Sequence, residues 1–155
     1  MKLYVLRHGK ADWPDWDKED SLRPLTEEGV KELRRAAKFW NKIGVAPKLI
    51  ITSPLPRARQ TAQLAHKQIG GELQLEAKLS PGATPRIVKS LLHEQMKSQS
   101  GDLMIVGHEP DLSEIIRSFT GAHVKMSKAG LARLDFENPQ QARLIWLLPP
   151  KISAH

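Results

Sequence analysis

Two histidines and two arginines stand where their side chains could act together on a phosphate group. Arg7 and His8 follow the apolar run KLYVL, Arg57 follows SPLP, and His108 follows the apolar run LMIVG. The planar guanidinium group of arginine matches phosphate oxygens in a bidentate arrangement. A neutral imidazole with a free ring nitrogen can attack phosphorus and carry the phosphoryl group as a covalent intermediate. These residue types therefore indicate phosphoryl transfer through a histidine nucleophile.

Each residue can be given a role in that chemistry. Arg7 and Arg57 would hold the non-bridging oxygens, helped by the positive N-terminus of the helix to which Arg57 belongs. His8 would attack phosphorus, while a hydrogen bond to a backbone carbonyl in the turn at Gly9 fixes its second ring nitrogen. His108 would stabilise negative charge on the transferring group. The arginines supply the positive charge, so neither a metal ion nor a cofactor is expected.

Alternating strand and helix patterns must position these residues. Short apolar runs predict strands over 2–6, 48–53, 73–77 and 102–106. Apolar residues at helical spacing predict helices over 26–43, 57–69, 84–96 and 110–119. A hairpin is predicted from the runs 131–136 and 143–148, which the turn ENPQQA separates, and the tail PPKISAH is expected to be frayed.

Repeated strand–helix units predict an α/β fold: a three-layer α/β/α sandwich with a mostly parallel central sheet. The length of 155 residues fits a single domain over 1–155. In such sheets, ligands bind beyond the carboxyl ends of the strands. Arg7 and His8, Arg57, and His108 all come just after predicted strands. We therefore expect these side chains, far apart in the sequence, to meet at one edge of the sheet.

Composition narrows the setting in which the chain would work. The sequence has no cysteine, which excludes disulfides and thiolate metal sites and fits a reducing cytoplasm. The opening run MKLYVL is too short for the core of a signal peptide, and no apolar run approaches the roughly 18 residues that span a membrane. We expect a cytoplasmic protein with no membrane partner. A monomer is the expected state, although no sequence feature fixes it.

The net charge of +7 and pI near 9.8 predict attraction to anions, whether nucleic acid, acidic protein or a phosphorylated substrate. Lys and Arg are spread along the chain, and one Tyr and three Phe give no obvious stacking platform for single-stranded nucleic acid. No specific nucleic acid is therefore expected. A solvated basic surface explains the charge equally well.

Four motifs, LRHGKA, LTEEG, SPLPRARQTA and VGHEP, resemble those of the histidine phosphatase superfamily, which includes the cofactor-dependent phosphoglycerate mutases. The resemblance covers roughly residues 1–120. The short length and the segment SLRPLTEEG make the chain most similar to the compact SixA-type phosphohistidine phosphatases. The resemblance implies a phosphoglycerate mutase-like fold.

The resemblance also implies roles for individual residues. It makes His8 the nucleophile, Arg7 and Arg57 phosphate ligands, and His108 the second phosphate-binding histidine. Arg23, in RPLT, matches an extra arginine that SixA-type proteins carry at this place.

The proton donor is where the sequence departs from the family. Mutase-type relatives carry a glutamate in the segment after the SPLPRARQTA helix, and here Lys78 aligns with it in LEAKLSPGATP. Three other acids are candidates: Glu76 two positions earlier, Glu109 directly after His108 (similar to the His-Asp pair of the acid-phosphatase branch), and Asp12 after the nucleophile. An alkoxide leaving group needs a proton, whereas imidazole, with a conjugate-acid pKa of about 6.5, needs less help. A missing acid therefore favours a phosphohistidine substrate.

We thus expect a metal-independent phosphatase that removes phosphate from phosphohistidine in a signalling protein, such as a histidine phosphotransfer domain. One alternative is a small-molecule phosphomonoesterase with Glu109, Glu76 or Asp12 as general acid. Another is a non-catalytic phosphate-binding or nucleic-acid-binding module on the same fold. The acidic loop DWPDWDKEDS (12–21) carries Trp13 and Trp16. It is either a lid or docking surface beside the nucleophile, or a plain surface loop pinned by tryptophan packing.

Overall fold

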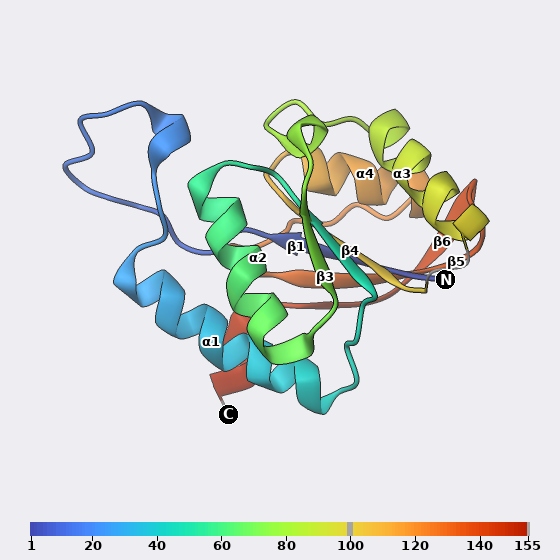
Figure 1. Cartoon of the computed structure of the whole chain (residues 1–155), viewed down its shortest axis with the longest axis horizontal. Coiled ribbons are helices and arrows are strands. Elements are labelled where there is room, and N and C mark those ends of the chain that lie inside the picture. The colour runs from blue at the N-terminus through green and yellow to red at the C-terminus, as the bar shows by residue number, and fades with distance from the viewer. Residues whose placement is uncertain (99–100, 155) are drawn as a thin grey trace.

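The computed structural model describes residues 1–98 and 101–154, and these form one sheet flanked by helices (Figure 1). The strand order is β3-β2-β4-β1-β5-β6, with β1 to β4 parallel, β5 antiparallel to β1, and β6 antiparallel to β5. The strand bounds are β1 Lys2–Arg7, β2 Leu49–Thr52, β3 Glu72–Leu75, β4 Leu103–Gly107, β5 Leu131–Asn138 and β6 Gln141–Leu148.

Helices cover both faces of this sheet, which confirms the predicted three-layer α/β/α arrangement. The helix bounds are α1 Glu27–Lys42, α2 Pro56–Ile69, α3 Pro85–Ser98 and α4 Asp111–Thr120, with short 3-10 helices η1 Asp20–Leu22, η2 Ala77–Leu79 and η3 Pro150–Ala154. Apolar side chains of α1 and α2 share one buried cluster with one face of the sheet. Side chains of α3 and α4 form the second cluster against the other face.

The central strand β1 shows why the sequence is apolar at successive positions. Leu3 and Val5 point into the cluster with α3 and α4, whereas Tyr4 and Leu6 point into the cluster with α1 and α2. A parallel strand buried on both faces has no solvent side, so an alternating polar pattern is absent. The strand ends at Arg7, and the chain leaves the sheet at the edge where β4 also ends.

Helix α1 is tied to the loop that follows β1. The Thr26 side chain caps the helix by accepting the Gly29 N–H at 3.0 Å, and the Thr26 N–H donates to the Lys10 carbonyl at 2.9 Å. A Cβ on Gly29 would lie 2.4 Å from that same carbonyl oxygen. Glycine therefore lets α1 approach the backbone beside the nucleophile candidate.

The C-terminal region differs from expectation in two places. Strands β5 and β6 extend further than predicted, so the turn shrinks from ENPQQA to residues 139–140. The prediction of a frayed tail is wrong for residues 150–154: Pro150 is buried, and η3 packs against α1. Of the rest of the predicted tail, Pro149 is exposed and belongs to no helix or strand, and residue 155 lies outside the described residues.

Within residues 1–98 and 101–154, no helix combines the length and the apolar character that crossing a bilayer requires.

Candidate active site

A cavity of about 450 Å³ lies at the carboxyl edge of the parallel strands. Its lining comes from segments far apart in the sequence: Arg7, His8, Ala11, Asp12, Asp20, Arg23, Arg57, Pro81, His108, Glu109 and Lys128. The four side chains around which the phosphoryl-transfer hypothesis was built are all among them. A larger hollow of about 620 Å³ opens at the opposite edge of the sheet, near Met1 and Asp102, and contains none of these four.

His8 is buried and held as a neutral imidazole with one free nitrogen. Its Nδ1 lies 2.8 Å from the Gly9 carbonyl, which is the backbone hydrogen bond predicted from the sequence. A carbonyl only accepts, so Nδ1 carries the hydrogen and Nε2 keeps a lone pair. Burial, together with the nearby charge of Arg57, lowers the pKa of His8 to about 4 against the opposing effect of the Gly9 hydrogen bond. The ring is therefore neutral at pH 7, as a nucleophile requires.

Gly9, whose carbonyl accepts the hydrogen bond from His8, is itself held in place by contacts with α1 and α2. Its N–H donates to Thr61 Oγ1 of α2 at 3.0 Å. A Cβ at this position would lie 2.5 Å from Leu33 Cδ1, so only glycine lets the turn pack here without a shift. Helices α1 and α2 thus position the carbonyl that orients His8.

His108 faces His8 across the cavity, with ring centroids 5.3 Å apart. Its Nε2 lies 2.8 Å from Ser53 Oγ. Ser53 Oγ also accepts the Leu55 N–H at 3.3 Å; when its own hydrogen is donated to Nε2, the hydrogen of His108 lies on Nδ1. Within the described chain, Nδ1 is buried without a hydrogen-bond partner. Burial lowers the pKa of His108 to about 3, and the neighbouring His8 and Arg57 contribute in the same direction.

The two predicted phosphate-binding arginines reach the cavity differently. Arg57, at the start of α2, is 5% exposed, and its Nε–H donates to the unprotonated Nε2 of His8 at 3.4 Å. Arg7 Nη1 donates to the Met126 carbonyl at 2.8 Å. Arg7 Nε is buried and has no partner in the part of the chain that the structure describes. Two residues that line one cavity thus each have a buried nitrogen without a partner in the described chain, which suits the binding of an anion.

Arg23, whose role the resemblance implied, also lines the cavity, together with an acid that the sequence analysis did not single out. Asp20 Oδ1 lies 2.8 Å from Arg23 Nε and 2.7 Å from Nη2. Its Oδ2 lies 3.4 Å from Arg57 Nη2, and its backbone carbonyl accepts from Arg57 Nη1 at 3.0 Å. Arg23 Nη1 donates to the Ala11 carbonyl at 2.7 Å. The only sequence signal for Asp20 is its place just before the LRPLT motif.

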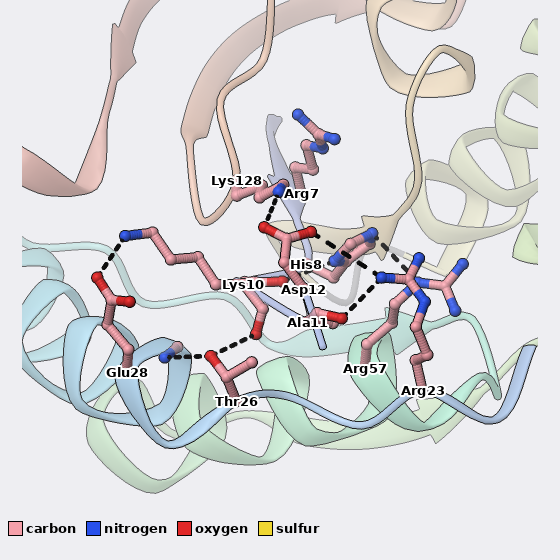
Figure 2. A network of polar contacts seen from close by, with 12 residues as sticks. Arg7, His8, Lys10, Ala11, Asp12, Arg23, Thr26, Glu28, Arg57 and Lys128 are labelled. Carbon is pink, nitrogen blue, oxygen red and sulfur yellow. Dashed lines mark hydrogen bonds and ion pairs between the residues drawn. The ribbon is translucent and has the colours of Figure 1, made fainter. Parts of the chain in front are cut away.

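The three candidate proton donors lie in different surroundings. Asp12 lines the cavity between Lys128 and Arg23 (Figure 2), and the hydrogen bond from Lys128 lowers the pKa of its carboxyl. Glu109 also lines it, and its two carboxylate oxygens contact the N–H and the hydroxyl of Ser113. Glu76 is not among the lining residues and instead accepts the Lys78 N–H at 3.2 Å.

Lys128 is a further cation of the cavity that sequence reasoning missed. It comes from the segment between α4 and β5, where no motif or periodicity marks it. Within residues 1–98 and 101–154, no cluster of three or more His, Cys, Asp or Glu side chains is arranged to hold a metal ion.

Known proteins resemble this chain in sequence and in fold. The model of the histidine phosphatase superfamily (branch 1) matches residues 3–81. An uncharacterised protein of Picosynechococcus sp. is 34% identical to this chain. The alignment covers 96% of this chain and 100% of that protein. The chain belongs to the histidine phosphatase superfamily. Its catalytic class is therefore that of a phosphatase, a hydrolase.

Among its relatives, the chain is most usefully compared with the SixA phosphatases. The phosphohistidine phosphatase SixA of Escherichia coli is 28% identical over 97% of this chain and 94% of its own length. A solved structure of the protein histidine phosphatase SixA in complex with tungstate superposes with a TM-score of 0.89, covering 98% of this chain and 99% of that chain at 20% identity. This superposition establishes a fold shared with SixA and with phosphoglycerate mutase-like proteins.

Proposed function

We propose that this phosphatase hydrolyses phosphohistidine in a partner protein, through a phosphorylated His8 and without a metal ion. The partner would be a signalling protein of the kind represented by histidine phosphotransfer domains. In this proposal one domain, residues 1–155, acts as a monomer in the cytoplasm. The arrangement of the three carboxylates that line the cavity carries the proposal.

Each of these carboxylates is already engaged as an anion or an acceptor. Asp12 is paired with Lys128, Asp20 is shared by Arg23 and Arg57, and Glu109 contacts Ser113 through both oxygens. A general acid must be protonated and within reach of the leaving atom. In the described part of the chain, the cavity therefore lacks a carboxylic acid poised to protonate an alkoxide.

A phosphohistidine substrate removes this difficulty. His8 Nε2 would attack phosphorus, and the electrons of the breaking P–N bond would go to the ring nitrogen of the substrate. The proton on the other ring nitrogen lets the substrate leave as neutral imidazole, because an imidazolium has a pKa of about 6.5. Water then attacks phosphorus on His8, restores the Nε2 lone pair, and releases its proton with inorganic phosphate.

The cationic side chains supply the remaining electrostatics. Arg7, Arg57 and Arg23 would bind the phosphoryl oxygens, and His108 would donate its Nδ1 hydrogen to the charge that develops in the transition state. The tungstate bound by the related SixA is an oxyanion, which supports an anion site in this fold. The name of the Escherichia coli relative, phosphohistidine phosphatase, supports the substrate class.

A paired assay tests the proposal. Purified protein without added metal is given a histidine-phosphorylated phosphotransfer domain in one reaction and a panel of phosphate monoesters in the other. His8→Ala is the loss-of-function variant, and His93→Ala, an exposed histidine on α3, is the matched control. We expect rapid phosphate release from the protein substrate, little from the monoesters, and loss of activity only in His8→Ala.

The other results are equally informative. Rapid monoester hydrolysis would mean that Glu109 or Asp12 serves as a general acid, and the phosphohistidine proposal would be wrong. Turnover of neither substrate above the His8→Ala background would leave a phosphate-binding module without catalysis.

A further inference from the structure

Asp20 lines the cavity and forms ion pairs with two of its arginines. Its side chain is 70% exposed, yet its carboxylate is held by Arg23 on one side and Arg57 on the other. Arg57 in turn contacts the free nitrogen of the nucleophile candidate His8. Two of the three arginines that would receive a phosphoryl group, Arg23 and Arg57, are therefore already bound to an anion that belongs to the chain.

The contacts of Asp20 are the type that phosphoryl oxygens would make. Three arginine nitrogens, Nε and Nη2 of Arg23 and Nη2 of Arg57, lie 2.7–3.4 Å from its carboxylate oxygens. Guanidinium groups bind carboxylate and phosphate through the same planar arrangement of N–H donors. A phosphoryl group that binds between Arg57 and Arg23 must take over these contacts, because two anions side by side in a half-enclosed cavity repel each other.

The charge of the cavity supports such an exchange. Among the described residues, four cationic side chains line it (Arg7, Arg23, Arg57 and Lys128) against three carboxylates (Asp12, Asp20 and Glu109), which gives a net charge of +1. Without Asp20 the net charge is +2, which balances a dianionic phosphoryl group. Replacing a carboxylate by a dianion therefore gains attraction, whereas replacing it by another monoanion does not.

We propose that Asp20 is a specificity-determining residue: an internal anion that an incoming dianionic phosphoryl group displaces and that a monoanion, such as a phosphodiester or a carboxylate, does not. The inference rests on the proposed function only in placing the phosphoryl group among these arginines. Asp20 also weakens the binding of inorganic phosphate, so the product of hydrolysis leaves the site more readily.

Anion binding in the absence of any substrate tests this inference. Calorimetric titrations at pH 8 use inorganic phosphate, which is then mainly dianionic, and dimethyl phosphate, a monoanion. The variants are Asp20→Asn and Asp17→Asn; the latter removes the same charge from an exposed position of the same loop. We expect Asp20→Asn to bind phosphate about tenfold more tightly, as the loss of a competing charge-assisted contact predicts. Dimethyl phosphate should bind to Asp20→Asn only, and Asp17→Asn should match the wild type within twofold.

Two results would overturn the inference. Weaker phosphate binding in Asp20→Asn would show that Asp20 organises the arginines and does not compete with the ligand. Equal changes in phosphate affinity in the two variants would show that Asp20 acts only through the general surface charge. If Asp20→Asn does not fold, Asp20→Ser provides the same removal of charge with a short polar side chain at the turn. These titrations need no turnover, so their outcome is separate from the hydrolysis assay.

Discussion

Burial is the main cause of the lowered pKa values of the two histidines in the cavity. His8 and His108 are both less than a tenth exposed, and their pKa values fall to about 4 and about 3. Both rings are neutral at pH 7 in the free protein. A bound phosphoryl group would favour the protonated form of each ring, so the proton affinity of the site depends on its ligand.

This burial predicts an acid-sensitive fold. Below pH 6.5 the unfolded chain protonates both histidines, but the folded chain does not until the pH approaches about 4 for His8 and about 3 for His108. The free energy of unfolding should therefore decrease as the pH falls through this window, by about 1.4 kcal/mol per pH unit for each histidine. Urea denaturation between pH 7.5 and 5, in buffers without phosphate, measures this slope.

Substitutions distinguish the contribution of the buried histidines to this slope from that of other titrating groups. His108→Gln should reduce the slope by about half, whereas His93→Gln, at an exposed position on α3, should leave it unchanged. An identical slope in His108→Gln and wild type would contradict the assignment of His108 as a buried neutral ring.

The site residues that the sequence predicted and those that it did not predict come from different kinds of segment. His8, Arg57 and His108 lie just after predicted strands, so the topology of a parallel sheet brings them together. Asp20 and Lys128 lie in irregular segments, where no periodicity tells which way a side chain points. Glu76 illustrates the converse, since it follows β3 but its carboxylate accepts a local N–H instead of lining the cavity.

Elements of secondary structure position the nucleophile candidate through close backbone contacts. Substitution of Gly29 tests one of these. Alanine in a helix is ordinarily about 1 kcal/mol more favourable than glycine. Here the added Cβ meets the Lys10 carbonyl oxygen at 2.4 Å, and a backbone group cannot rotate away. We expect Gly29→Ala to lower the free energy of unfolding by about 1–3 kcal/mol, measured by urea denaturation.

The matched control is Lys38→Ala, an exposed position on the same helix, which should change stability by less than about 0.5 kcal/mol. A stabilised Gly29→Ala would mean that α1 can move away from the Lys10 carbonyl at little cost.

The order and type of the elements were predictable because long apolar patterns with the right period leave few alternatives. The bounds of the C-terminal elements were less predictable. Residues 150–154 contain no periodic pattern, and their 3-10 helix depends on packing against α1, which the local sequence does not encode. Propensity likewise did not show that the hairpin strands continue to residues 138 and 141.

At the scale of the whole molecule, the loop between β1 and α1 projects beyond the sheet (Figure 1). Its residues Asp12 and Asp20 line the cavity. Trp13 and Trp16 pack on each other, with ring centroids 6.4 Å apart, and neither belongs to the two core clusters. Their indole N–H groups donate to the carbonyls of Pro24 and Glu19, both at 2.9 Å. The loop is thus fixed by its own contacts while Trp13 stays 41% exposed, which suits a preordered docking surface.

This surface predicts a difference between large and small substrates. Trp13→Ala should raise KM about tenfold for a histidine-phosphorylated protein and leave KM unchanged for free phosphoimidazole, as the loss of one aromatic anchor implies. Ile145→Ala, an equally exposed apolar residue at the opposite edge of the sheet, is the control and should change neither value. Equal increases for both substrates would show that Trp13 supports the cavity and does not contact a partner.

The placement of β1 has a consequence for the newly made chain. Of the six strands, the one that carries Arg7 is synthesised first, but it lies between β4 and β5, which begin at Leu103 and Leu131. Its backbone hydrogen bonds therefore wait for partners about a hundred residues or more downstream, and pairing over such separations is slow. Phosphatase activity should therefore appear only when β5 has been synthesised.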